Sequence, residues 1–261
     1  HFQLHCLPAH TGATVYELQA FKGNKLVAEE KVPVNILPGS RTRILFLSSS
    51  PGFENKFLAS WLYQNNYPAA VRNTVSQGKY EQQFLNLPAV GLQHISSSLL
   101  ENFDVLIADD MALSALGNNE VAAVRAQLNK GMGLILQTDS AASLSGFSRS
   151  FAIKKQAVQH ASARALVLPG QGTKTKPLPA EQWFSISHDP YAQPLVTDEQ
   201  ASVIVSSRLS GEGRIILNTA AYTYSWVLSG NEENYSAFWS LLINKASRQA
   251  RPQSKWQQSV A

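Results

Sequence analysis

The sequence predicts an α/β fold in which a parallel sheet is flanked by helices and preceded by a short β segment. Three observations support this prediction. Continuous apolar runs recur from residue 43 onward, helical apolar patterns lie between them, and period-2 alternation dominates the first 38 residues. Strand and helix alternating in this way give right-handed crossovers and therefore parallel strands.

The first 38 residues have β character. Gly23-Asn24 is a hairpin turn signal between two alternating segments. Three short strands bury little by themselves, so we expect them to be the last strands of a β-sandwich whose earlier part is missing. Pro38-Gly39-Ser40 is a linker signal. The expected strands are Phe2–Leu7, Thr14–Phe21 and Leu26–Leu37.

The α/β part begins with Ile44–Leu47, a continuous apolar run that predicts a buried strand. A helix is expected next, because apolar side chains recur at helical spacing and because Pro51 and Glu54 suit a first helical turn. These apolar residues are Phe53, Phe57, Leu58, Trp61 and Leu62. Ala69–Val71 predicts a short second strand.

The third expected strand, Asp104–Asp110, carries acids at its carboxyl end. Asn118-Asn119-Glu120 is expected to cap a helix that stops at Gly131. The fourth strand, Gly133–Gln137, ends in Thr138-Asp139-Ser140, where many α/β enzymes carry a nucleophile on a tight turn into a helix.

The second half of the chain is richer in strands. A tight turn at Gly211-Glu212-Gly213 separates the last two strands, and a helix with Tyr235, Phe238 and Trp239 on one face ends the fold. The expected strands are Phe151–Ile153, Ala165–Leu168, Trp183–Ile186, Ser202–Val205 and Arg214–Leu217. The predicted domains are 1–38, 39–247 and a polar tail over 248–261.

The amino-acid composition excludes several classes of function and of site. The net charge is +4 and is scattered rather than arranged in a stripe, which argues against nucleic-acid binding. The single cysteine, Cys6, rules out an intramolecular disulfide and a cysteine-rich zinc site. The sequence has no run of 18 apolar residues, so it predicts no membrane-spanning segment. The chain starts at His1 within a β pattern, so we expect a fragment of a longer protein.

Several segments resemble the glutamine-amidotransferase-like domains of bacterial envelope proteins. Arg43–Leu47 with Pro51–Leu58 is similar to their opening, and Phe103–Ile107 and Gly131–Leu136 are similar to their next two core strands. The ending is the most specific part, because it resembles the family pattern G-R-V … W-R-W … Y-x-x-F-W. The matching segments are Gly213–Leu217, Tyr224-Ser225-Trp226 and Tyr235–Trp239.

The resemblance covers roughly residues 40–247 and implies a flavodoxin-like class I amidotransferase fold. Such domains often follow Ig-like β modules in membrane-anchored proteins. The resemblance therefore implies a periplasmic or otherwise extracytoplasmic location, envelope proteins as possible partners, and anchoring through flanking segments. It implies no cofactor.

The catalytic residues of that family are absent at the matching positions. A class I amidotransferase needs a Cys nucleophile on a G-x-C-x-G elbow and a late His-x-Glu pair. Here the elbow region reads Gln137-Thr138-Asp139-Ser140, and Cys6 lies in the β segment. The sequence therefore argues against glutaminase activity.

A divergent hydrolase is the alternative. Ser140 would be the nucleophile and His188 the base, with Asp139 as a further candidate catalytic residue. Asp189 follows His188 directly, and adjacent residues seldom form a base and its orienting acid, so Asp109 or Asp110 would have to help. The competing interpretation makes Asp139 or Ser140 a cap and places His188 on a loop.

A ligand site at the carboxyl edge of the sheet is also predicted, because α/β sheets bind ligands there. Its candidate residues are Glu54, Asp109, Asp110, Asp139 and Ser140. Asp109 and Asp110 could hold a divalent cation together with Asp139, but capping and turn formation before Met111–Leu116 is the favoured interpretation of this pair, and we predict no metal site. Glu54 is a candidate partner of Arg72.

Aromatic residues gather near the end of the chain. They could form part of the core, or they could form an exposed surface that binds sugars or a partner protein. They are Tyr222, Tyr224, Trp226, Tyr235 and Trp239. Taken together, the sequence favours a non-catalytic interaction or ligand-binding domain, a pseudoenzyme of the cell envelope, over a hydrolase.

Overall fold

The computed structural model describes residues 12–36, 41–76, 78–140, 142, 145–156, 162–169, 174–180 and 182–248. The chain divides into two compact units, residues 1–41 and 42–261. The expected strand Phe2–Leu7, the linker Pro38–Ser40 and the tail beyond residue 248 lie outside the described residues.

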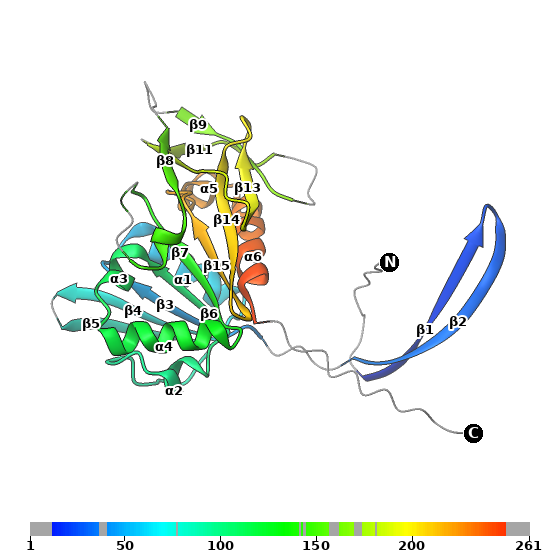
Figure 1. Cartoon of the computed structure of the whole chain (residues 1–261), viewed down its shortest axis with the longest axis horizontal. Coiled ribbons are helices and arrows are strands. Elements are labelled where there is room, and N and C mark those ends of the chain that lie inside the picture. Colours follow the sequence, from blue (N-terminus) through cyan, green and yellow to red (C-terminus); the bar gives the residue numbers. More distant parts are fainter. Residues whose placement is uncertain are drawn as a thin grey trace. The chain divides into compact units, whose positions relative to one another are not determined.

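The first unit contains one antiparallel hairpin, β1 (Gly12–Lys22) and β2 (Lys25–Ile36), drawn in blue in Figure 1. Its turn falls at Gly23-Asn24, as predicted, and Gly23 has a φ of 63°, which favours glycine. Apolar side chains such as Val15 and Phe21 are exposed on it. A second sheet packed against this hairpin is not among the described residues, so the Ig-like sandwich stays a prediction.

The second unit is built on a mixed sheet whose centre is parallel (Figure 1). Its parallel strands are β3 (Ile44–Ser48), β4 (Ala69–Ser76), β6 (Val105–Asp109), β7 (Gly133–Gln137) and β15 (Gly213–Asn218). Across the sheet they run β4-β3-β6-β7-β15. In chain order this is second, first, third, fourth, fifth, the strand order of flavodoxin-like folds.

Antiparallel strands extend the sheet at both ends. On one side β4 pairs with β5 (Lys79–Leu85), and on the other β15 pairs with β14 (Val203–Ser210), which pairs with β13 (Ala192–Asp198). The remaining strands are β8 (Ile153–Gln156), β9 (Ser162–Arg164), β10 (Leu166–Val167), β11 (Leu178–Ala180) and β12 (Trp183–Ile186).

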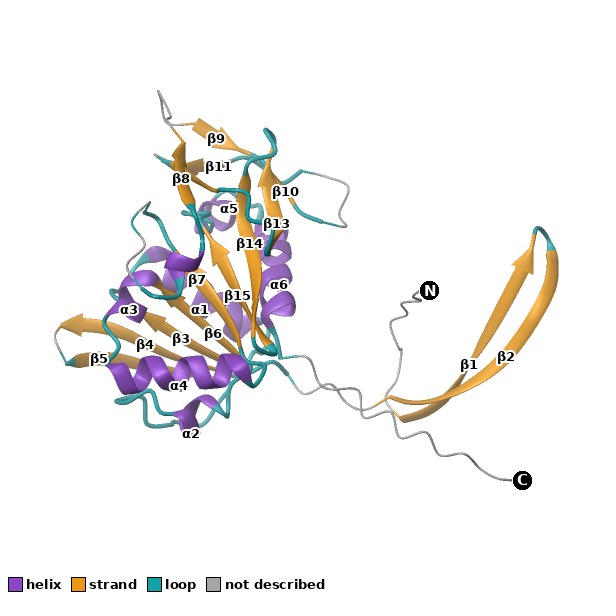
Figure 2. Cartoon of the chain, viewed as in Figure 1, coloured by secondary structure: helices purple, strands orange, loops and turns teal. Residues whose placement is uncertain are grey.

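Helices cover both faces of the sheet, and each face has its own hydrophobic cluster. The first cluster joins α1 (Phe53–Gln64), α5 (Tyr224–Leu228) and α6 (Glu232–Ala246) to the sheet. The second joins α2 (Ser97–Leu100), α3 (Asp110–Ser114) and α4 (Asn118–Asn129) to the opposite face. Figure 2 shows these helices in purple around the orange strands. The α/β prediction with helices flanking a parallel sheet is confirmed.

Gly133 allows α6 to end directly against β7. A Cβ atom at this position would lie 2.0 Å from the backbone oxygen of Ala246. Because that atom belongs to the backbone, it cannot rotate away, so a side chain at 133 would push the helix from the sheet.

Some element predictions need correction. The strand expected at Ala69–Val71 continues to Ser76 with increasingly exposed residues, and β5, which follows it, was not predicted. The helix over 118–129 is capped by Gly117, whose N–H donates to Glu120, rather than by Asn118. Among the described residues between β7 and β8, the helical element is a 3₁₀ turn, Ser148–Ser150, and not an α-helix.

β13 was also not predicted; it contains Pro194, a residue that is uncommon inside strands. Pro194 lies opposite Ser206 of β14, and β10 pairs with β13 only at Thr197 and Asp198, so no strand pairs with position 194 on its other side among the described residues. Within the described part of the chain, no helix is long and apolar enough to cross a membrane.

Candidate functional site

The carboxyl edge of the parallel sheet brings most of the predicted residues into one region. The strand order reverses between β3 and β6, which is where flavodoxin-like folds leave a crevice. Asp109 lies at this crevice, at the carboxyl end of β6. Its Oδ2 accepts a hydrogen bond of 2.6 Å from the N–H of Ser49, and its Oδ1 accepts one of 2.7 Å from the N–H of Ala112. Asp109 therefore caps α3 and ties β3 to β6.

Asp110 binds two serines of the segment that follows β7, Ser145 and Ser148. It is buried, and its carboxylate accepts hydrogen bonds from the N–H of Ser145 at 3.0 Å and from the hydroxyl of Ser148 at 2.8 Å. These donors satisfy a buried charge that would otherwise be costly. The two acids expected to face a ligand are thus both engaged with the protein.

Ser140 lies on a local turn rather than on a strained elbow. Its Oγ accepts a hydrogen bond of 3.1 Å from the N–H of Ala142, and its backbone oxygen accepts one from Thr138. Asp139 beside it is exposed. This arrangement is a serine turn, in which the hydroxyl substitutes for a backbone partner.

His188 is not joined to Ser140. The described histidines are His94 and His188, and no hydrogen bond links either of them to Ser140. His188 is exposed, and the carboxylate of Asp189 accepts from the N–H of Tyr191 at 2.8 Å and lies 3.5 Å from Arg208. The structure therefore assembles no nucleophile–base pair from the predicted residues.

Glu54 is the site residue whose surroundings are most unusual. It lies in the first turn of α1, and its Oε1 accepts a hydrogen bond from the hydroxyl of Thr223. Thr223 in turn accepts a hydrogen bond of 3.1 Å from the indole N–H of Trp239. Burial raises the pKa of Glu54 to about 7, although the hydrogen bonds from Thr223 and Tyr224 lower it.

Two aromatic side chains are linked to Glu54: that of Tyr235 through the charge of Glu54, and that of Trp239 through Thr223. Burial and the charge of Glu54 raise the pKa of Tyr235. Trp226 and Trp239 are fully buried and belong to the core, whereas Tyr222 is exposed. Arg72 does not pair with Glu54: its guanidinium donates to the backbone oxygen of Leu92 at 3.1 Å, on the other face of the sheet.

A groove of about 900 Å³ begins beside this cluster, between α1 and the β4–β5 hairpin. Alternate residues of the hairpin, including Asn73 and Gln83, face α1 because of the period-2 geometry of strands. The rings of Phe53 and Tyr63 line the groove and are 67% and 59% exposed. The side-chain oxygen of Asn73 is buried and has no hydrogen-bond partner among the described residues.

Sequence reasoning missed this groove because it missed β5. The signal was present: Tyr80-Glu81-Gln82-Gln83-Phe84 alternates in part, and Gly78 precedes it with a φ of 71°, as a hairpin turn requires. Polar residues on both faces of this edge strand hid its periodicity.

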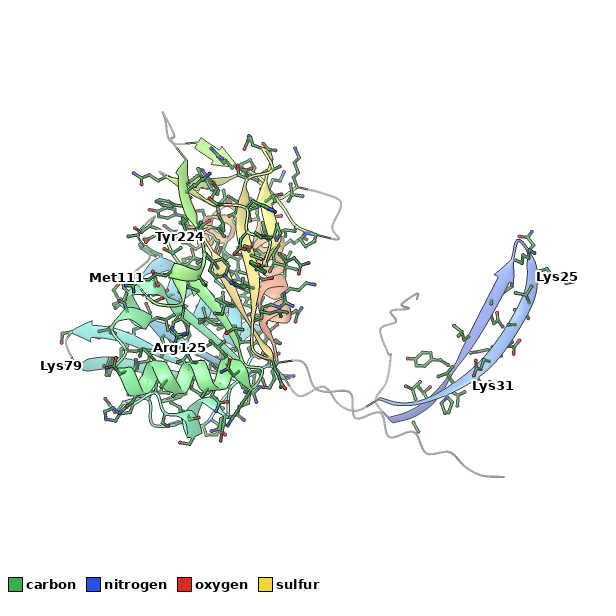
Figure 3. All side chains as sticks on the ribbon, in the orientation of Figure 1. Lys25, Lys31, Lys79, Met111, Arg125 and Tyr224 are labelled. Atoms are coloured by element: carbon green, nitrogen blue, oxygen red, sulfur yellow. The ribbon has the colours of Figure 1, made fainter. Side chains whose placement is uncertain are left out.

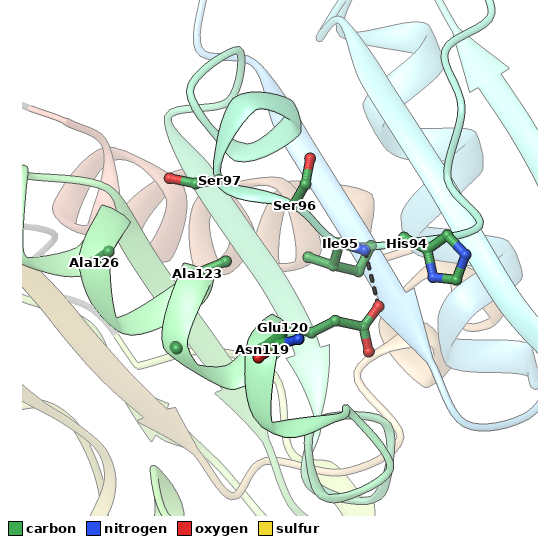
Figure 4. A pocket seen from close by; sticks show the side chains of 9 residues that line it. His94, Ile95, Ser96, Ser97, Asn119, Glu120, Ala123 and Ala126 are labelled. Carbon is green, nitrogen blue, oxygen red and sulfur yellow. Dashed lines mark hydrogen bonds between the residues drawn. The ribbon is translucent and has the colours of Figure 1, made fainter.

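A second cavity of about 530 Å³ lies between α2 and α4 (Figure 4). Its only carboxylate among the described lining residues is that of Glu120, which accepts hydrogen bonds from the N–H groups of Ile95 at 2.8 Å and Gly117 at 3.0 Å. Alanine side chains form much of the remaining wall. This cavity therefore offers little chemistry, and the groove beside α1 is the better candidate site.

No family model and no curated protein matches this sequence. Solved structures do match. Cytoplasmic protein STM1381 from Salmonella typhimurium LT2 is 12% identical to this chain, with a TM-score of 0.55. The match covers 79% of this chain and 100% of that one. Cytoplasmic protein STM3548 from Salmonella typhimurium is 9% identical with a TM-score of 0.52, over 92% of this chain and 98% of that one.

A chain from Bacteroides uniformis ATCC 8492, described as ThuA-like, is 12% identical with a TM-score of 0.49, over 82% of this chain and 93% of that one. The two Salmonella proteins share the fold of this chain, and at such low identity the likeness extends to the fold alone. The third likeness, with its lower TM-score, supports no assignment.

Proposed function

We propose that this chain is a non-catalytic, amidotransferase-like ligand-binding domain of a bacterial cell-envelope protein. The observation that carries the proposal is the engagement of the potential catalytic groups. Ser140 is bound within its own turn, while Asp109, Asp110 and Glu54 all accept hydrogen bonds from neighbouring protein groups. Groups held in this way stabilise the edge of the sheet and are poorly placed to attack a substrate.

Assays with glutamine and with p-nitrophenyl esters and anilides test the absence of catalysis. We expect the wild-type protein and the Ser140→Ala variant to turn over these substrates no faster than buffer. An active serine esterase in the same assay shows that the conditions permit hydrolysis. Turnover by the wild type that disappears in Ser140→Ala would instead establish the divergent hydrolase that uses Ser140 and His188.

The groove between α1 and β4–β5 is the ligand site in this proposal. Exposed rings, amide groups and a hydroxyl line it, and its charged side chains, Lys56 and Glu81, carry opposite signs. Small-ligand sites commonly combine apolar rings with polar groups that orient the ligand, and this groove has both. A neutral polar ligand such as a saccharide fits these features.

Titration calorimetry with glucose, N-acetylglucosamine and maltose tests this ligand class. We expect saturable binding of at least one of these probes and a loss of about tenfold or more in affinity in Tyr63→Ala and Phe53→Ala. Tyr191→Ala is the matched control, because Tyr191 is an exposed aromatic residue that does not line the groove. Absence of binding for all three sugars would remove the saccharide assignment.

The envelope location and the envelope partners are proposals of the same kind. They rest on the resemblance of the chain to envelope proteins, whereas the two Salmonella structures are named as cytoplasmic proteins. Fractionation of cells that express the full-length gene product distinguishes these locations. Recovery in the membrane or periplasmic fraction is expected, and recovery in the cytoplasmic fraction would contradict the proposal.

A further inference from the structure

A small cavity of about 230 Å³ lies on the α4 face of the sheet, away from the groove beside α1. It is formed by α4, the segment at residues 146–150 and the β14–β15 hairpin. Two arginines line it, Arg125 from α4 and Arg208 from β14. Arg125 is labelled on α4 in Figure 3.

Stacking holds Arg125 in place rather than an ion pair. Its guanidinium lies 4.9 Å from the centre of the Phe147 ring. It also lies directly over Gly146, because a Cβ atom added there would come within 2.9 Å of Nη2. No carboxylate lies within ion-pair distance of Arg125 in the described part of the chain. The guanidinium is therefore oriented while its donors are not used by another charged group.

Arg208 lines the same cavity from β14. It is paired across the hairpin with Ile215, so both side chains are on the face that carries α4. Its Nη1 donates to the backbone oxygen of Ser150 at 3.0 Å and lies 3.5 Å from the carboxylate of Asp189. Among the described ion pairs of these two arginines, only Arg208 has a carboxylate partner, Asp189, so the two guanidinium groups leave a net positive charge at the cavity.

We propose that this cavity binds a small oxyanion, a phosphate or carboxylate group, between Arg125 and Arg208. Planar guanidinium groups present paired donors that match the oxygen atoms of such anions. The volume suits one anionic group with few additional atoms. The site is separate from the groove and does not depend on the function proposed for it.

Calorimetric titration of the whole chain with inorganic phosphate and with succinate, at low ionic strength, tests the proposal. Saturable binding with one site per chain is expected, with affinity reduced about tenfold or more in Arg125→Gln and in Arg208→Gln. Lys79→Gln removes the same charge from an exposed position on β5 and is expected to bind like the wild type. An equal loss in all three variants would mean that only the net charge matters, and would overturn the site.

Two further variants test the geometry without removing an arginine. Gly146→Ala is expected to displace the Arg125 guanidinium from Phe147 and to weaken binding severalfold at unchanged charge. Asp189→Asn keeps the acceptor for the N–H of Tyr191 but removes the competing negative charge, so it is expected to strengthen binding. Weaker binding in Asp189→Asn would contradict the proposal.

The source of the anion is distinguished by a vesicle assay. If free phosphate and succinate do not bind, phosphatidylglycerol vesicles are compared with phosphatidylcholine vesicles by sedimentation. Binding to phosphatidylglycerol alone that is lost in both arginine variants supports the same chemistry on a lipid headgroup. Failure to bind either the free anions or the anionic vesicles would overturn the proposal.

Discussion

At the residue scale, a chain of hydrogen bonds runs from a buried indole to a carboxylate. Trp239 donates to Thr223, and Thr223 donates to Glu54, which lies 169 positions earlier in the sequence. This chain fixes the first turn of α1 to the segment that precedes α5. The carboxylates of Asp109 and Asp110 act in a similar way, so acids that a catalytic domain could use for chemistry hold the loops together here.

Glu54 makes the stability of the fold dependent on pH. Its pKa is about 7 in the folded protein and about 4.5 in the unfolded chain, so between these values the folded state retains a proton that the unfolded state has released. The free energy of unfolding should therefore decrease as pH rises from about 4.5 to 7, by on the order of 2 kcal/mol. Urea denaturation at several pH values across this range measures the change in the free energy of unfolding.

The variant Glu54→Gln cannot ionise and should have a flatter profile over the same window. Glu233→Gln is the control, since Glu233 is an exposed acid on α6 and should leave the profile unchanged. A Glu54→Gln profile as steep as that of the wild type would show that another group controls this dependence.

Thr223 is expected to be sensitive to loss of its hydroxyl. Thr223→Val keeps the shape of the side chain but leaves the Trp239 N–H and the Glu54 carboxylate without their partner in a buried place. The expected loss is about 1–3 kcal/mol in the free energy of unfolding. Thr223→Ser retains the hydroxyl and should lose much less; comparable losses in both variants would argue that packing of the methyl group matters more.

At the element scale, the buried strands were predictable and the exposed edges were not. Ile44–Leu47 and Gly133–Gln137 are buried on both faces, so their continuous apolar runs identify them without knowledge of their neighbours. β5 is an edge strand with polar residues on both faces, and the groove depends on it. The partners of Glu54 were not predictable either, because they come from distant segments whose register only the folded sheet defines.

The contact between α6 and β7 is expected to tolerate no side chain at Gly133. The variant Gly133→Ala would place a methyl group against the backbone of Ala246 and should lose about 1–3 kcal/mol or more. Gly91→Ala is the control, because no atom lies within 4 Å of the added Cβ there. Urea denaturation of both variants measures the difference, and equal stability would mean that α6 shifts without cost.

At the scale of the whole second unit, the two proposed sites lie on opposite faces of one sheet. The groove is lined by residues from α1 and the β4–β5 hairpin, whereas the two arginines lie near the β14–β15 hairpin. The parallel strands between them are buried on both faces. The two sites have no lining residue in common, and these buried strands lie between them.

Binding at the two sites is therefore expected to be independent. The affinity for inorganic phosphate should be the same, within about twofold, with and without a saturating concentration of the sugar that binds most tightly. The gains in stability from the two ligands should also add, because the sites share no residue. Thermal unfolding with each ligand and with both measures this, and a change in phosphate affinity of tenfold or more would reveal coupling.

The position of β15 has a consequence for the order of assembly during synthesis. β15 covers the edge of β7, but it follows β7 by about 80 residues in the chain. At 5–20 residues per second, the ribosome needs roughly 4–16 s to supply it, and during that time the backbone N–H and C=O groups of β7 have no partner strand on that side. Nascent chains that stop before residue 213 should thus be cleaved within β7 by a protease that spares longer chains.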